Sequence, residues 1–213
     1  MIFSTDCHRC PRLAEFLVAV RSEHPDYHAL PVNSFGESYS PFLIVGLAPG
    51  MHGANRTGRP FTGDYAGKLL YESLHKYGFS TSAEPLDEEN NANQKLILKN
   101  CRITNAVRCL PPQNKPEPAE IKICNDYLTE ELAMLPQGAA VMALGTIAHN
   151  AVLMALRLRK SSYPFAHGAQ HELLNGITLF DSYHCSRYNT QTKRLTTEMF
   201  ETVIANITNH LEN

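Results

Sequence analysis

The sequence predicts one α/β domain in which a mostly parallel sheet is covered by helices on both faces, a three-layer α/β/α arrangement. Short apolar runs alternate along the chain with segments of helical periodicity, which is typical of βα units. The runs are almost continuously apolar, as in strands that are buried on both faces. The 213 residues contain no internal repeat and no linker long enough to divide them, so we expect a single domain over residues 1–213.

The first half of the chain begins with a predicted helix over residues 11–24, where Leu13, Leu17 and Val20 have helical spacing and Pro11 occupies the first turn. An apolar run over 42–47 is strand-like. Residues 65–77 form the next predicted helix, which Gly78 ends. Residues 80–94 are polar and irregular, and a short strand follows over 102–107.

The second half continues the alternation. A helix is predicted over 118–135, a strand over 139–144, a helix over 146–158, a strand over 176–181 and a closing helix over 196–211. In parallel sheets, ligands bind beyond the carboxyl ends of the strands. The segments that follow Leu47 and Asp181, together with Asn105 near the end of its strand, should therefore meet at one edge of the sheet.

Composition excludes several classes of protein. No window is apolar enough for a membrane span, and the first residues, MIFSTDCHRC, lack the apolar core of a signal peptide. We therefore expect an intracellular, cytoplasmic protein without a membrane partner. The net charge of −2 does not itself indicate nucleic-acid binding, but the basic residues gather in two segments. A basic face of this kind suits transient contact with a phosphate backbone.

These two segments are the most informative parts of the chain. The first runs from Gly46 to Asp64 (GLAPGMHGANRTGRPFTGD) and follows the apolar run over 42–45. The second runs from His184 to Thr196 (HCSRYNTQTKRLT) and follows the predicted strand over 176–181. Glycine-rich and basic loops that follow buried strands are typical of a binding site.

The six cysteines suggest a metal centre. Cys7 and Cys10 form a Cys-x-x-Cys pair, and Cys109 and Cys124 lie far downstream, so the four thiols could close one four-cysteine site. From spacing alone, zinc or free thiols are as well supported as an iron–sulfur cluster. Cys101 is expected in the core. Cys185, beside His184, allows a nucleophile hypothesis, but the resemblance described next gives a plainer account of it.

Both segments and the four cysteines resemble the uracil-DNA glycosylase superfamily, specifically its iron–sulfur branch with families 4 and 5. Residues 46–64 are similar to the family 5 (B-type) motif GLAP-[AG]-x-HG-x-NRTGR-x-FTGD, and residues 184–196 to HPS-x-x-N-x-x-T-x-RLT, with Cys185 in place of Pro. Family 4 usually has GEAPG where this chain has Leu47, which cannot polarise water. The resemblance implies a uracil-DNA glycosylase-like fold and a 4Fe-4S iron–sulfur cluster, held by Cys7, Cys10, Cys109 and Cys124.

The resemblance also implies a monofunctional glycosylase that flips uracil, and other deaminated bases, out of DNA and hydrolyses the N-glycosidic bond, which begins base excision repair. Phe61 would stack on the base and Asn105 would read its edge. His184 would donate to the base oxygen on which negative charge develops. Asp64 would position water or stabilise the sugar cation, or would cap the helix over 65–77.

The remaining expected site residues contact the base or the DNA strand. Residues that form the substrate pocket through their backbone are Gly46, Leu47, Ala48, Pro49 and Gly50. Expected DNA contacts are Arg56, Ser186, Arg187, Asn189 and Arg194, with Arg187 or Tyr188 as the side chain that fills the vacated stack. We expect a monomer that acts on DNA containing uracil or other deaminated bases.

Three alternatives stay open from the sequence. One is a glycosylase specialised for hypoxanthine, xanthine or another damaged base, which would fit the apolar Leu47. Another is a catalytically inactive module that binds DNA through the same loops. The third is an iron–sulfur protein of electron transfer or redox sensing, which would have no need of the NRTGR and FTGD segments.

Overall fold

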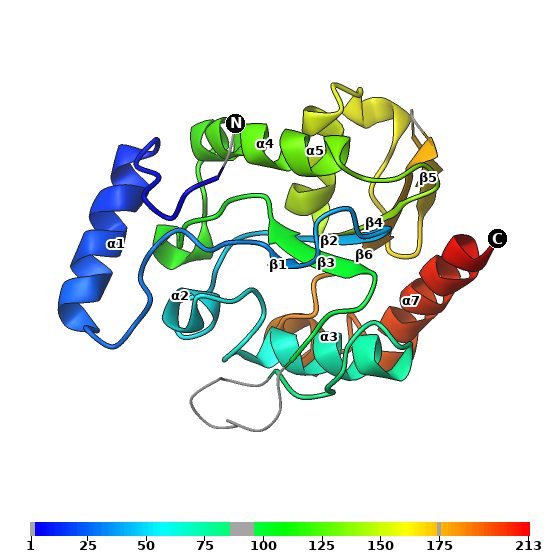
Figure 1. Ribbon diagram of the computed structural model, residues 1–213, viewed down its shortest axis with the longest axis horizontal. Coiled ribbons are helices and arrows are strands. Elements are labelled where there is room, and N and C mark those ends of the chain that lie inside the picture. Colours follow the sequence, from blue (N-terminus) through cyan, green and yellow to red (C-terminus); the bar gives the residue numbers. More distant parts are fainter. Residues whose placement is uncertain (1–2, 86–95, 174–175) are drawn as a thin grey trace.

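The computed structural model describes residues 3–85, 96–173 and 176–213, and within these ranges a six-stranded sheet lies between two layers of helices (Figure 1). The strand order is β1-β3-β2-β4-β6-β5. The strands are β1 (Phe35–Gly36), β2 (Phe42–Gly46), β3 (Cys101–Asn105), β4 (Ala140–Leu144), β5 (Gln170–Glu172) and β6 (Thr178–Ser182). The four central strands are parallel and the two edge strands antiparallel, so the predicted mostly parallel sheet is confirmed.

The helices divide between the two faces of the sheet. Helices α4 and α5 cover one face, and α3 and α7 cover the other, while α1 lies at one end of the molecule (Figure 1). The helices are α1 (Pro11–Glu23), α2 (Ala54–Thr57), α3 (Tyr65–Lys76), α4 (Pro118–Ala133), α5 (Thr146–Ala155), α6 (Arg187–Gln191) and α7 (Thr197–Glu212), with 3-10 turns η1 (Pro112–Asn114) and η2 (Lys160–Ser162). The three-layer α/β/α prediction is therefore confirmed.

Strand β2 illustrates why these residues form a central strand. Its side chains alternate between the faces, so that Phe42 and Ile44 pack towards α3 and α7, and Leu43 and Val45 towards α4 and α5. All five residues of the strand are buried. A strand covered on both faces has no polar side, which accounts for the unbroken apolar run in the sequence.

The structure corrects the predicted elements mainly at their ends. Most boundaries shift by one to three residues, as helix ends fray and strands pair over shorter lengths. The sequence missed β1 and β5, which have two and three residues and are too short to carry an apolar pattern. It also missed the short helices α2 and α6, which interrupt the two segments expected to be loops. Of the irregular segment over 80–94, residues 86–94 lie outside the described residues.

Every helix in the described ranges is too short or too polar to pass through a lipid bilayer.

Candidate functional site

A cavity of about 560 Å³ opens at the edge of the sheet where β2 and β3 end. Gly46 and Asn105 are the last residues of these strands and are register partners. The start of the second segment joins them there, because His184 lies two residues beyond the end of β6. The cavity is lined by Leu47, Ala48, Gly50, Met51, His52, Gly53, Ala54, Phe61, Asp64, Tyr65, Ala66, Asn105, Asn114, His184, Ser186 and Arg187. The convergence that strand order predicted is therefore found.

Phe61 forms one wall of the cavity. Its side chain is buried, and its backbone has a φ of 56°, which is the left-handed region that a bulky residue rarely adopts. The ring lies 5.9 Å from the ring of His184 between centroids, with an interplanar angle of 28°. A methyl group at Gly46 would come within 2.9 Å of the Phe61 ring and would also clash with Oδ1 of Asn105. Glycine at position 46 thus lets both side chains approach the strand end.

Asn105 lines the cavity and carries an unpaired polar atom. The residue is 4% exposed, and its Oδ1 atom has no hydrogen-bond partner among the described residues. An unsatisfied buried acceptor costs about 1–3 kcal/mol of stability, so such an atom in a cavity indicates a ligand that supplies the donor. A base with an imide N–H has this property, and the amide Nδ2 can donate to a neighbouring carbonyl.

His184 is a neutral imidazole at physiological pH. Burial lowers the pKa of His184 to about 4. Its backbone is held by the second segment, since the Asn189 side-chain amide donates to the His184 carbonyl over 2.8 Å. Ser186 in turn caps α6 by accepting from the Asn189 backbone N–H. The imidazole can therefore act as a hydrogen-bond donor to developing negative charge, without a net positive charge of its own.

Asp64 takes the capping role, one of the two roles that the sequence allowed, and its position leaves the other role open to it. Its Oδ1 atom accepts from the Gly67 backbone N–H over 3.0 Å and caps α3, while the residue also lines the cavity. Burial raises the pKa of Asp64 above the ordinary range, and the backbone N–H groups of Gly67 and Ala66 oppose that rise. A methyl group at Gly53 would lie 2.5 Å from Oδ2, so the glycine leaves room beside the carboxylate.

The predicted substrate-pocket residues do not all reach the cavity. Leu47, Ala48 and Gly50 line it, whereas Gly46 and Pro49 are buried and do not line it. Cys185 is fully buried in the apolar cluster under α3 and α7, and burial raises the pKa of its thiol far above the ordinary value. An inert core thiol is not a nucleophile, so the alternative hypothesis for Cys185 is wrong.

The expected DNA contacts fall into two groups, of which one lines the cavity and the other does not. Ser186 and Arg187 line it, and the Arg187 guanidinium lies 5.3 Å from the centroid of the Tyr65 ring. Arg194 stacks in the same way on Tyr183, at 4.7 Å. Asn189 and Arg56 instead brace the loops, because Asn189 holds the His184 carbonyl and Arg56 donates to the His52 carbonyl over 3.1 Å.

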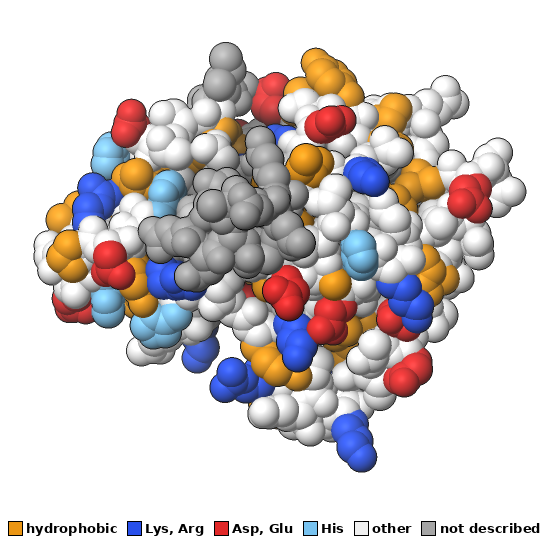
Figure 2. All heavy atoms as spheres, turned by 60° about the horizontal axis from the view of Figure 1, so that its bottom comes forward, with side chains coloured by type: hydrophobic (Ala, Val, Ile, Leu, Met, Phe, Trp, Pro, Cys, Tyr) orange, Lys and Arg blue, Asp and Glu red, His pale blue; other side chains and the backbone are white. Residues whose placement is uncertain are grey.

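Acidic, basic and His side chains are all present on the face of the molecule that Figure 2 shows. Figure 2 shows several His side chains gathered on the left of this face, and acidic and basic side chains intermixed on both sides of it. Tyr188 is 70% exposed on α6, next to Arg187. A large exposed aromatic beside a basic residue suits insertion into a base stack.

Sequence reasoning missed Asn114 as a cavity residue. It ends the turn η1, has a φ of 56° and reaches the cavity from the segment between Cys109 and Cys124. The sequence signal was the pair Pro111-Pro112, which forces a turn, followed by a residue type that tolerates positive φ. Nothing local in that pattern says that the turn points towards the ends of β2 and β3.

The four cysteines named as metal ligands lie together beside α1 and α4. Cys7, Cys10, Cys109 and Cys124 line one small pocket with Tyr127 and other mostly apolar neighbours. The Arg108 backbone N–H donates to Sγ of Cys124 over 3.3 Å, and the Tyr127 hydroxyl donates to Sγ of Cys7 over 3.4 Å.

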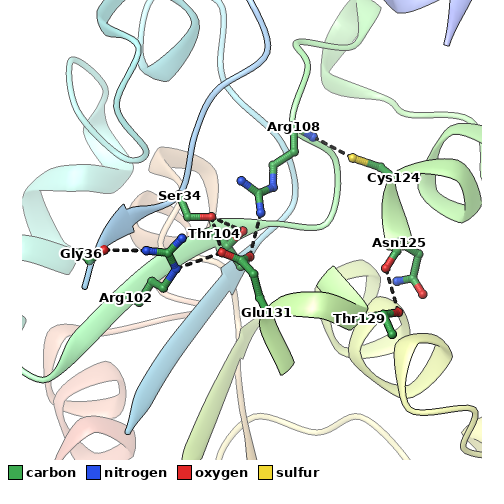
Figure 3. A network of polar contacts seen from close by, with 9 residues as sticks. All are labelled: Ser34, Gly36, Arg102, Thr104, Arg108, Cys124, Asn125, Thr129 and Glu131. Carbon is green, nitrogen blue, oxygen red and sulfur yellow. Dashed lines mark hydrogen bonds and ion pairs between the residues drawn. The ribbon is translucent and has the colours of Figure 1, made fainter. Parts of the chain in front are cut away.

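A buried ionic network connects this region to the sheet (Figure 3). Glu131 of α4 accepts from Arg108 over 2.7 Å and from Arg102 over 2.9 Å, and Ser34 donates to the same carboxylate. Burial alone would raise the pKa of Glu131, but the Arg108 charge and the Ser34 hydroxyl hold it below the ordinary value. The carboxylate is thus a fixed anion that anchors the strand end preceding Cys109.

The family model and the relatives that match this chain all come from one superfamily. The family model described as the uracil DNA glycosylase superfamily matches residues 34–208. A type-5 uracil-DNA glycosylase of Thermus thermophilus is 46% identical over 94% of this chain and 91% of its own length. Type-5 uracil-DNA glycosylases of Pyrobaculum aerophilum and Mycobacterium bovis are 37% and 38% identical, over 93% and 92% of this chain and 86% and 75% of their own lengths.

Proposed function

The chain belongs to the uracil DNA glycosylase superfamily, and on this basis we propose that it hydrolyses the N-glycosidic bond of uracil in DNA and so starts base excision repair. One observation carries the proposal beyond family membership. Phe61, Asn105, Asp64 and His184 come from three separate segments of the chain and line a single cavity. Its volume lies in the range of small-molecule pockets, about 300–1,000 Å³, so it can take a base flipped out of the duplex.

The base would be held by stacking and by its edge. The flat ring of Phe61 forms a wall on which a pyrimidine stacks, an interaction of about 1–3 kcal/mol. The unpaired Oδ1 of Asn105 would accept from the imide N–H, and its Nδ2 would donate to the adjacent carbonyl. Thymine carries the same polar edge, so discrimination against it must come from the shape of the cavity beside its methyl group.

Bond cleavage leaves negative charge on the base and positive charge on the sugar. His184 would donate its N–H to the base oxygen that gains negative charge. This hydrogen bond would stabilise the transition state of bond cleavage, and the imidazole that donates it is neutral. Asp64 would then orient the attacking water or stabilise the sugar cation. Because burial raises the pKa of Asp64, we expect excision to slow on the acid side as this carboxylate takes up a proton.

A broader range of substrates follows from Leu47. This side chain lines the cavity and offers no polar group that would select one base or activate water. We therefore include other deaminated bases, such as hypoxanthine and xanthine, among the substrates. Ser186, Arg187 and Arg194 would contact the strand around the flipped nucleotide, with Tyr188 or Arg187 filling the vacated stack. The protein would act on DNA as a monomer and as a single domain.

The four cysteines supply the all-thiolate donor set that a 4Fe-4S cluster takes, and they line one mostly apolar pocket. The donors from Arg108 and Tyr127 are of the kind that stabilise cluster thiolates. Cys7, Cys10, Cys109 and Cys124 would hold the cluster, which would join α1 to α4 in a structural role.

The cluster has its own test. Cys109→Ser should lower the yield and the thermal stability of the purified protein before it changes the chemistry of excision. The absorbance of the brown chromophore and the iron content should fall together. Normal folding and undiminished colour in this variant would overturn the assignment of Cys109 as a ligand.

The function is tested with purified protein and duplex DNA that carries one uracil. Parallel duplexes carry hypoxanthine, xanthine or no lesion, and alkali converts each abasic site into a strand break. Breaks at uracil and none in the undamaged duplex are expected, and the other lanes rank the substrates. If folded, brown protein leaves every duplex intact, the inactive DNA-binding module becomes the better explanation.

A further inference from the structure

A second group of chemically reactive side chains lies on the sheet outside the cavity. His149 of α5, His171 of the edge strand β5 and Asp181 of β6 come together, and none of them lines the cavity. One ring nitrogen of each histidine and a carboxylate oxygen all lie within 4.8 Å of one another. Asp181 is fully buried, and the His149 side chain is almost so.

Two polar atoms in this group have no hydrogen-bond partner among the described residues. They are Nε2 of His171 and Oδ2 of Asp181, and both are buried. They lie 3.3 Å apart but lack the alignment of a hydrogen bond with each other. Buried polar atoms are almost always paired, so two unpaired atoms at this distance indicate a common partner.

The distance between them suits a small metal ion. Around zinc, bonds of about 2.0–2.2 Å to imidazole nitrogen and carboxylate oxygen place tetrahedral ligands about 3.3 Å apart. We propose that His149, His171 and Asp181 bind one Zn²⁺ ion, with water as the fourth ligand. Two histidines and one carboxylate are a donor set that zinc takes in proteins.

The surroundings support His149 as a ligand. Its Nε2–H donates to the Tyr163 carbonyl over 2.9 Å, and its Nδ1 lies 2.7 Å from Oδ1 of Asp181. A ligand histidine usually donates its second N–H to a backbone carbonyl in this way, which fixes the ring orientation. Both neighbours of the ring, the Tyr163 carbonyl and the Asp181 carboxylate, are acceptors, so a metal ion at Nδ1 would take the place of the N–H that faces Asp181. Zinc takes the lone pair of Nδ1, and one proton leaves to solvent.

The ion would connect three elements that otherwise meet at a weak edge. Strand β5 has only three residues and pairs on one side, with β6. The chain continues from Asp181 to His184 within three residues. Zinc would therefore tie α5 and the edge strand to the strand that delivers His184 to the cavity. The rings of Phe165 and Tyr163 pack against the two histidines and limit the access of water.

The test measures zinc in protein that already contains its iron. Wild-type protein, His171→Ala and His171→Gln are dialysed against micromolar zinc chloride, passed over a desalting column and analysed for zinc and iron. Glu172→Ala is the matched control, because Glu172 is the exposed neighbour on the same strand and its loss removes a carboxylate outside the group. Comparable iron in all four proteins excludes zinc that has entered the cysteine site.

We expect about one more zinc per chain in the wild type and Glu172→Ala than in either His171 variant. Added Zn²⁺ should raise the melting temperature of the first two proteins and leave that of the His171 variants unchanged. Equal zinc in all four proteins, or none in the wild type, would overturn the proposal. The group would then be an ion pair made by protein atoms alone.

Discussion

The cavity and the Glu131 network treat buried polar groups in opposite ways. In the cavity, Oδ1 of Asn105 has no partner among the described residues, and burial holds His184 neutral. In the network, both carboxylate oxygens of Glu131 accept hydrogen bonds from charged donors (Figure 3). Unpaired atoms reduce stability and are useful only when a ligand arrives, whereas paired atoms contribute to one fixed structure.

The backbone shows the same contrast. Phe61 adopts the left-handed region in the cavity wall, at a cost of about 1–3 kcal/mol for a residue of this kind. Glu131 lies within regular helix and its partner Arg102 within regular strand. The cavity thus has a strained backbone position and an unpaired buried atom, whereas Glu131 and its two arginine partners have neither. We therefore expect substitutions in the Glu131 network to lower stability, and substitutions in the cavity to lower the rate of excision.

The largest effect on stability is expected in the network. Glu131→Ala leaves Arg108, which is 3% exposed, without its carboxylate, and such a broken pair costs about 3–5 kcal/mol. Denaturant unfolding of the variant should show this loss, while excision by the fraction that folds stays close to the wild-type rate. Glu130→Ala, the exposed neighbour, is the control and should change stability much less. A large loss of activity in folded Glu131→Ala would contradict the separation.

The largest effect on chemistry is expected at His184. Removal of one donor to developing negative charge slows catalysis by about 10²–10³-fold, so single-turnover excision by His184→Ala should fall by that factor. Binding to uracil-containing DNA, measured by fluorescence anisotropy, should stay within a few-fold of the wild type. The melting temperature should not fall, because the variant removes a polar ring at the cavity wall and leaves the Asn189 bond to the backbone carbonyl in place. Full activity would remove His184 from the mechanism.

The fold was predictable because its signals are local. Continuous apolar runs located β2 and β4 to within one residue at each end, and the alternation with helices gave the parallel sheet. Strands β1 and β5 were missed because their place depends on pairing with β3 and β6, not on any pattern of their own. The same holds for α6, which Ser186 caps inside a segment that reads as loop.

The lining of the cavity was predictable where a motif carried it. The Gly46–Asp64 segment contains Phe61 and Asp64, and strand order brought Asn105 and His184 to the same edge. What the sequence could not provide is the state of these groups. The neutrality of His184 comes from burial, and the unpaired Oδ1 of Asn105 comes from three segments that meet without a donor. Asn114 enters through a turn whose direction depends on the tertiary fold.

A smaller effect is expected when the cavity wall loses its flat ring. Phe61→Leu keeps an apolar side chain but removes the stacking surface, so kcat/KM for uracil excision should fall by about 5- to 160-fold, which corresponds to the 1–3 kcal/mol of base stacking. Phe79→Leu is the matched control, because Phe79 is equally buried and packs on Phe42 away from the cavity. The control should lower stability and leave kcat/KM unchanged. If Phe61→Leu instead lowers stability and leaves kcat/KM unchanged, Phe61 belongs to the core and does not contact the base.

The smallest effect is a pH dependence of stability. The pKa of His184 is about 4 in the folded protein and about 6.5 in an unfolded chain. Between these values the unfolded chain takes up a proton that the folded protein does not, so His184 lowers stability progressively as the pH falls from 6.5 towards 4 and has no such effect above 6.5. His184→Gln should therefore lose less melting temperature than the wild type over this window. His75→Gln, a change at an exposed histidine of α3, should follow the wild type. Parallel curves of melting temperature against pH for His184→Gln and the wild type would mean that the cavity admits enough water to solvate the imidazolium. The polar groups of the cavity would then resemble those of an exposed surface. Their difference from the buried groups around Glu131 would come from hydration and not from a missing partner.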